Sequence, residues 1–315
     1  MLLDGASPGA EWELMPGLKL STNSDRLRTF LTPEFRSSIG IIGSTSLLSA
    51  QHFVFAEFTA EDINKFLPAH HGQPEIALML LETVLLWLRG FLRASWLIKD
   101  NSMSCEGAYA IYPSSGLPVS ASANCLHELN ITCDGKKFVP CPLTPAELRQ
   151  LIEVHHKVET ALFQCRQEHG EALAGQGSRI VRCFEFLQTA RTAYSIPLRM
   201  AHYCSALEAL FGTSTVELSH RLSERIAHMA GQSRKERLAV YAIAKDAYTL
   251  RSQVVHGAPL SKSFTPKVFD VCSKTDSMLR TILCRILADP QMLALLSGPS
   301  EGIDAFFLDR LMSPN

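Results

Sequence analysis

Helix start signals recur through the second half of this chain, and they constrain what it can fold into. Thr144-Pro145-Ala-Glu147 combines an N-cap residue, a proline at the first helical position and a capping acid. Ser233-Arg-Lys-Glu236 repeats the device and predicts a helix that runs to His256. Thr265-Pro266 opens another helix, which Asp289-Pro290 ends before starting the next. Helices at this spacing predict a bundle with short antiparallel connections.

The first part of the chain carries strand signals instead. Residues 52–58 and 107–112 are rich in aromatic and branched side chains and predict short strands. The turn Asp134-Gly135 between residues 128–133 and 136–139 predicts a β-hairpin. An apolar run over residues 76–98 predicts a long buried helix, and Thr59 with Asp62 is typical of the start of a short one. The first two dozen residues, with scattered Gly, Pro, Ser and Asn, are expected to be irregular.

These patterns predict two domains with a boundary near residue 145. Residues 1–145 form a mixed α+β domain and residues 146–315 an all-α domain, so that the chain is predominantly helical. Residues 170–178, GEALAGQGS, predict a flexible linker. The apolar run over residues 76–88 contains Glu82 and ends at Arg89, which is too short and interrupted to span a bilayer. No secretory signal is recognisable, and we expect a cytoplasmic protein.

Cysteine and histidine patterns do not predict a metal site. Cys125, Cys133 and Cys141 recur at eight-residue intervals near His127, but none forms the C-x-x-C pair that zinc sites usually use. The adjacent pairs at residues 70–71 and 155–156 would point apart on regular structure. We therefore expect buried or free thiols in a reducing compartment, and no metal or other cofactor.

The near-neutral net charge of −1 hides an asymmetry. Residues 1–145 hold ten Lys and Arg against fourteen Asp and Glu, whereas residues 179–260 hold eleven against six. Such a basic region can attract a polyanion. The alternative is that its arginines form ordinary ion pairs with carboxylates on helix surfaces.

Arg251-Ser-Gln-Val-Val-His256-Gly257 places a guanidinium and an imidazole at the end of a predicted helix. An arginine offers a planar fork of donors that matches phosphate oxygens, and a histidine can transfer a proton near neutral pH. A five-residue step separates two positions by roughly 140° around a helix, so the two do not share a face. They converge only if the arginine sweeps round the helix or if a second copy of the motif meets the first across a dimer interface. The alternative is a capping histidine and an arginine that pairs with a carboxylate.

The run from Tyr248 to Gly257 resembles the R-x4-6-H signature of HEPN domains, most closely the ApeA-like branch with its RS-x-x-x-HG form. Residues 203–211, YCSALEALF, and 217–227, ELSHRLSERIA, resemble the two preceding helices of that branch. The resemblance covers residues 180–290 approximately. It implies an up-and-down helical bundle that pairs into a homodimer, in a family with many metal-independent endoribonucleases.

By this resemblance Arg251 and His256 are the catalytic positions, with Glu208 and Arg225 as polar supports. Ser252, beside the arginine, departs from the Asn, Asp or His that active members often carry. Glu208 lies in an apolar segment, so it needs a partner if it is buried, and Arg225 or Arg251 is the natural candidate. The alternative for these residues is a structural ion pair or an exposed glutamate.

The implied function is cleavage of RNA by attack of a ribose 2′-hydroxyl, in a bacterial toxin or an antiviral abortive-infection effector. The first domain would act as sensor or restraint. The second hypothesis is a non-catalytic HEPN module that binds RNA, a nucleotide or a partner protein such as a nucleotidyltransferase antitoxin. A third is an unrecognised activity in residues 1–145, with a bundle that only dimerises. No membrane partner is expected.

Overall fold

The computed structural model describes residues 2–3, 11–50, 52–59, 61–62, 76–105, 107–114, 117–124, 129–169, 178–213, 218–256 and 265–312. The protein is predominantly helical, with a small three-stranded antiparallel sheet near its N-terminus. None of the helices in these ranges is long and apolar enough to cross a membrane. The chain divides into two compact units, which do not follow one another along the sequence.

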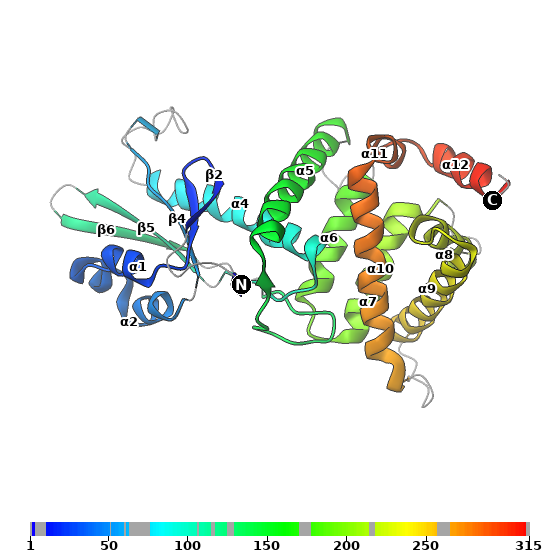
Figure 1. Cartoon of the computed structure of the whole chain (residues 1–315), viewed down its shortest axis with the longest axis horizontal. Helices are drawn as coiled ribbons and strands as arrows, with labels where there is room; N and C mark the ends of the chain where they lie inside the picture. Colours follow the sequence, from blue (N-terminus) through cyan, green and yellow to red (C-terminus); the bar gives the residue numbers. More distant parts are fainter. Residues whose placement is uncertain are drawn as a thin grey trace. The chain divides into compact units, whose positions relative to one another are not determined.

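The first unit comprises residues 1–92, 103–129 and 140–152. Its sheet has the order β2-β3-β4, from Glu11–Met15, Leu18–Ser21 and Phe53–Ala56. Two further pairs are β1 (Leu2–Leu3) parallel to β7 (Pro142–Leu143), and β5 (Ala108–Ser114) antiparallel to β6 (Leu117–Asn124). Its helices are α1 (Ser24–Phe30), α2 (Pro33–Ser49) and most of α4 (Ile76–Ile98). In Figure 1 helices α1 and α2 and strand β4 are blue, α4 is cyan, and β5 and β6 are green.

The strands predicted at residues 52–58 and 107–112 are confirmed as β4 and β5, and the long helix at residues 76–98 is confirmed as α4. The expectation that the first two dozen residues are irregular is wrong for β2 and β3. Leu14, Leu18 and Leu20 are buried, so the apolar positions of this hairpin join the sheet despite the polar residues around them. Gly17, at a φ of 82°, makes the tight turn between the two strands.

The second unit comprises residues 93–102, 130–139 and 153–315. Its elements include α6 (Arg179–Thr192), α7 (Ile196–Phe211), α8 (Leu218–Ala230), α9 (Arg234–Val255) and α10 (Val268–Ala288). The short helices α11 (Pro290–Ser297) and α12 (Ser300–Met312) follow, and most of α5 (Pro145–His169) belongs here. Helix α7 packs against α6, α9 and α10, as Figure 1 shows for the green, yellow and orange helices. Its buried residues Met200, Leu207 and Leu210 contribute to one large apolar core.

The predicted helix starts are confirmed. Thr144 and Glu147 form reciprocal side-chain to backbone hydrogen bonds at the start of α5, and Ser233 and Glu236 form a capping box at the start of α9. Thr265 begins a 3-10 turn, η3 (Thr265–Lys267), that leads into α10, and Asp289 caps α11. Thr59 and Asp62 hydrogen-bond as expected for a helix start, although the residues that follow lie outside the described ranges. Residues 170–177 of the predicted linker also lie outside them.

The β-hairpin predicted around Asp134-Gly135 is wrong over the described residues 129–139, which contain the turn but no strand. The backbone on the first side of the turn bonds to helices instead. The N–H of Ile131 donates to the carbonyl of Arg191, and the guanidinium of Arg199 donates to the carbonyl of Thr132. These bonds replace a strand ladder. The segment belongs to the helical unit, so the contacts do not follow a single break at residue 145.

Replacing Ser233 with alanine is expected to lower the free energy of unfolding by about 1 kcal/mol, because the backbone N–H of Glu236 loses its hydroxyl acceptor. Urea denaturation followed by circular dichroism measures the change. Gln232→Ala, at an exposed neighbour outside the helix, is the control and should stay within about 0.5 kcal/mol of the unchanged protein. Equal midpoints for Ser233→Ala and the unchanged protein would contradict a stabilising cap.

Candidate functional site

The end of α9 carries the predicted catalytic pair. Arg251 lies in the last turns of the helix, and its side chain is 30% exposed. His256 is the C-cap residue and is exposed, and its backbone N–H donates to the carbonyl of Ser252 at 3.1 Å. Ser252 is also exposed. An imidazole at this position is open to solvent and lies where a helix dipole favours positive charge. Gly257 lies outside the described residues.

Glu208, on α7, is the partner that orients Arg251. Its Oε1 lies 3.6 Å from Nη2 of Arg251, and its side chain is 22% exposed. The same oxygen is fully buried and accepts no hydrogen bond within the described part of the chain. Its interaction with Arg251 is therefore an ion pair at slightly more than hydrogen-bonding distance. A half-buried pair of this kind holds the guanidinium in place while other donors face outward.

Tyr248 lies one turn before Arg251 and closes the buried side of this pair. It is 6% exposed, and its hydroxyl donates to the carbonyl of Cys204 at 3.4 Å. Burial raises the pKa of the Tyr248 hydroxyl, and the nearby carboxylate of Glu208 raises it further. The tyrosine therefore stays a neutral donor beside Glu208. The structure thus brings together Glu208, Tyr248 and Arg251 at the α7–α9 contact, whereas the sequence predicted no role in the site for Tyr248.

Arg225 does not pair with Glu208. It is buried on α8, donates to the carbonyl of Phe211 at 2.6 Å and to Oγ1 of Thr213 at 3.0 Å, and forms an ion pair with Asp304 on α12. Arg251, and not Arg225, is therefore the partner of Glu208. The contacts of Arg225 join the middle of α8 to the end of α7 and to α12.

Three of the eleven basic residues of 179–260 are buried in the helical unit. Arg199 is completely buried and donates to the carbonyls of Ala190 and Ala193 at the end of α6. Arg191 is 1% exposed and donates to Asn101, and burial lowers its pKa to about 10. Because these guanidinium groups and that of Arg225 face the interior, the count of eleven basic residues overstates the charge available to a polyanion.

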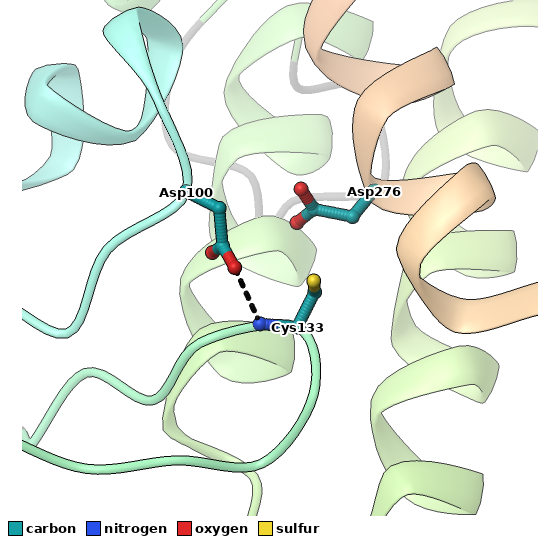
Figure 2. Close-up of side chains that lie close together, drawn as sticks. All are labelled: Asp100, Cys133 and Asp276. Carbon is teal, nitrogen blue, oxygen red and sulfur yellow. Dashed lines mark hydrogen bonds between the residues drawn. The ribbon is translucent and has the colours of Figure 1, made fainter. Parts of the chain in front are cut away.

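A second cluster lies in the helical unit and was not anticipated from the sequence. Figure 2 shows the carboxylates of Asp100 and Asp276 and the thiol of Cys133 converging from the end of α4, from α10 and from the 130–139 loop. One candidate ligand atom from each lies within 4.8 Å of the others. Oδ2 of Asp100 accepts a hydrogen bond from the Cys133 N–H at 2.9 Å, whereas its Oδ1 is buried without a hydrogen bond in the described part of the chain.

Asp276 is the centre of this network. It is 1% exposed, and its Oδ1 accepts from Nε1 of Trp96 at 2.8 Å and from the Tyr203 hydroxyl at 2.7 Å, while its Oδ2 pairs with Arg280. Burial raises the pKa of this carboxyl and Asp100 adds to the effect, whereas Arg280 and the two hydrogen bonds lower it. All three partners donate, so the arrangement fits an ionised carboxylate.

Sulfur with two carboxylates is a donor set that zinc accepts. Here, however, both oxygens of Asp276 already accept hydrogen bonds from protein donors. Burial also raises the pKa of the Cys133 thiol to about 12, and Asp100 and Asp276 add to the shift. The thiol therefore stays protonated at neutral pH unless a bound cation displaces its proton. We assign the cluster a structural role, in which Asp276 ties α4, α7 and α10 together.

The sequence did contain a signal for this cluster. Asp276 follows Cys272 by four residues and precedes Leu279 by three, so it lies on the apolar stripe of α10. An acid at such a position needs a partner, as Glu208 does.

Of the other metal candidates, Cys125, His127 and residues 70–71 lie outside the described ranges. His155 is buried and His156 exposed, as expected for adjacent residues of a helix.

Replacing Asp276 with asparagine is expected to lower the free energy of unfolding by about 3 kcal/mol, because Arg280 loses its countercharge inside the bundle. Chemical denaturation measures the loss. Asp270→Asn is the matched control on the same helix, because its pair with Lys274 is exposed, and it should cost no more than about 0.5 kcal/mol. A similar small effect at both positions would show that Asp276 is not a structural centre.

Cys133 is expected to react slowly with iodoacetamide in the folded protein. A rise of its pKa from 9.0 to about 12 reduces the thiolate fraction at pH 8 by about a thousandfold. Labelling followed by peptide mass spectrometry, with and without urea, compares the folded and unfolded states. Equal labelling rates of Cys133 in both would contradict a thiol that the fold keeps protonated.

Comparison of the chain with protein-family models, curated proteins and solved structures gave no match.

Proposed function

We propose that this protein is a metal-independent endoribonuclease of the HEPN type, with Arg251 and His256 as its catalytic residues. The observation that carries the proposal is the end of α9. There a guanidinium is held by the carboxylate of Glu208 at 3.6 Å, and an exposed imidazole occupies the C-cap of the same helix. The motif resemblance of residues 248–257 and the helical architecture of the unit that contains it support the same function.

In the proposed reaction a ribose 2′-hydroxyl attacks the adjacent phosphorus. His256 transfers a proton as general acid or base, and Arg251 stabilises the additional negative charge on the phosphoryl oxygens. Glu208 positions Arg251, and Tyr248 closes the inner side of their ion pair. The bond from phosphorus to the 5′-oxygen of the next nucleotide breaks, and that oxygen takes up a proton. The products are a 2′,3′-cyclic phosphate and a 5′-hydroxyl end, and DNA is a poor substrate because it lacks the attacking hydroxyl.

The complete site is proposed to form in a homodimer of the helical unit. Positions 251 and 256 are roughly 140° apart around an ideal helix, so the two side chains leave α9 in different directions. A second copy of α9 would supply the missing partner across the interface. The protein would act as a bacterial toxin or an antiviral abortive-infection effector, with the first unit as a sensor or restraint.

A second candidate function is a non-catalytic module that binds RNA, a nucleotide or a partner protein such as a nucleotidyltransferase antitoxin. The inward orientation of Arg191, Arg199 and Arg225 favours it, because it reduces the basic surface that would hold a long RNA. Ser252 favours the binding module as well, because active members often carry Asn, Asp or His at this position.

Arg251→Ala and His256→Ala are each expected to reduce RNA cleavage by at least about a hundredfold, because each removes a group that acts on the phosphodiester. Cleavage of total RNA by the purified full chain, with and without EDTA, measures the effect, and mass spectrometry of the products detects the cyclic phosphate. Arg234→Ala is the matched control, because Arg234 is an exposed arginine in the first turn of the same helix.

Glu208→Gln separates positioning from structure. It keeps the shape of the side chain and removes the charge that holds Arg251. It should therefore lower the turnover rate while leaving the thermal unfolding midpoint close to that of the unchanged protein.

Full cleavage by both alanine variants would remove Arg251 and His256 from the site. Lack of cleavage by the unchanged protein, together with measurable RNA binding, would instead support the binding module.

A further inference from the structure

A groove of about 110 Å³ lies between α8 and α12, apart from the proposed nuclease site. The wall from α8 is formed by Arg221, Glu224, Arg225 and His228. These positions follow the spacing i, i+3, i+4 and i+7, which places them on one face of a helix. All four side chains on this wall are charged or titratable.

The wall from α12 has the same spacing and a different chemistry. It begins with Asp304 and continues with Phe307, Leu308 and Leu311. Phe307 is buried, whereas Leu308 is 56% and Leu311 50% exposed. Two packed helices usually match apolar faces, but here an apolar wall faces a charged one. The groove therefore offers both kinds of contact to a single ligand.

Asp304 lines the groove and pairs with Arg225. Its Oδ1 accepts from the Thr213 hydroxyl at 2.7 Å and pairs with Arg225, whose guanidinium lies 5.2 Å from the centre of the Phe307 ring. Although partial burial acts in the opposite direction, the hydrogen bonds from Thr213 and Arg225 lower the pKa of the Asp304 carboxyl. The carboxylate is therefore ionised and already occupied by Arg225.

Arg221 retains donors for a ligand. Its contact with Asp304 is 3.5 Å long and uses the oxygen that Arg225 and Thr213 already share, and its side chain is 44% exposed. A guanidinium has five N–H donors, and most of those on Arg221 have no acceptor among the described residues. Among the described residues that line the groove, Arg221 is the exposed cation, because the Arg225 side chain is only 8% exposed.

His228 adds a neutral hydrogen-bonding group to the charged wall of the groove. Burial lowers the pKa of this imidazole, and the nearby cations Arg237 and Arg310 lower it further, whereas Glu224 acts in the opposite direction. His228 is then neutral at neutral pH and can both donate and accept a hydrogen bond. With Asp304 occupied by Arg225, Glu224 is the acid of the lining that opposes these cations.

We propose that this groove binds a small amphipathic organic anion. Its carboxylate or phosphate pairs with Arg221, and its apolar portion covers Phe307, Leu308 and Leu311. The assignment is independent of the proposed nuclease activity, because it uses residues of α8 and α12 alone. A fatty carboxylate and a nucleotide share this chemistry, and binding measurements distinguish between them.

Isothermal titration calorimetry with the full chain tests the proposal. The probes are octanoate with 1-octanol as its uncharged analogue, and adenosine monophosphate with adenosine as its analogue. At least one anion is expected to bind once per chain and about tenfold more tightly than its uncharged analogue, because the charge-assisted hydrogen bonds to Arg221 are lost with the charge. The anion that binds identifies the source. Failure of both, or equal binding of anion and analogue, would overturn the proposal.

Two pairs of variants locate the site. Arg221→Gln is expected to weaken binding about tenfold, whereas Arg234→Gln, at an exposed arginine of α9, should leave it unchanged. Leu311→Glu, on the apolar wall, should weaken binding, whereas Met312→Glu, at the next and more exposed position, should not. Circular dichroism confirms that each variant is folded. Unchanged affinity in both Arg221→Gln and Leu311→Glu would place the ligand elsewhere and refute the groove.

Discussion

The helical unit depends on guanidinium groups that satisfy the carbonyls at its helix ends. The last carbonyls of a helix lack partners within the helix, and burying them unpaired is costly. Arg199 bonds the end of α6, Arg179 and Arg225 bond the end of α7, and Arg285 bonds the end of α8. Each arginine thereby joins one helix to the end of another. The helices can therefore end inside the bundle rather than at its surface.

This arrangement changes the meaning of the basic region. Counted along the sequence, the positive charge of residues 179–260 predicts attraction to a polyanion. In the structure Arg179, Arg199 and Arg225 donate hydrogen bonds to helix carbonyls. Arg251 is held by the carboxylate of Glu208, and Arg221 faces a groove with an apolar wall. Both arrangements fit the recognition of an individual anionic group better than that of a long charged surface.

Asp276 is a second residue that joins helices of the bundle through hydrogen bonds. Its carboxylate takes hydrogen bonds from Trp96 on α4 and Tyr203 on α7 while pairing with Arg280 on its own helix. The donors come from residues that are far apart in the sequence, and no spacing rule connects them. The apolar periodicity of α10 placed the acid on the buried face, but only the packed helices show which donors it meets. The same holds for Tyr248, whose position beside Glu208 depends on the packing of α9 against α7.

Some helices and strands of this protein could be predicted from the sequence because they depend on local interactions. The starts of α5, α9 and α11 follow from caps that act within four residues, and β4, β5 and α4 follow from runs of apolar residues. Tertiary structure decided the rest. The turn at Asp134-Gly135 did not become a hairpin, because Arg191 and Arg199 offered its backbone partners in the bundle. Likewise, the partner of Glu208, the Asp276 network and the α8–α12 groove exist only once distant segments meet. Interactions of long sequence separation depend on that packing, whereas caps and periodicity do not.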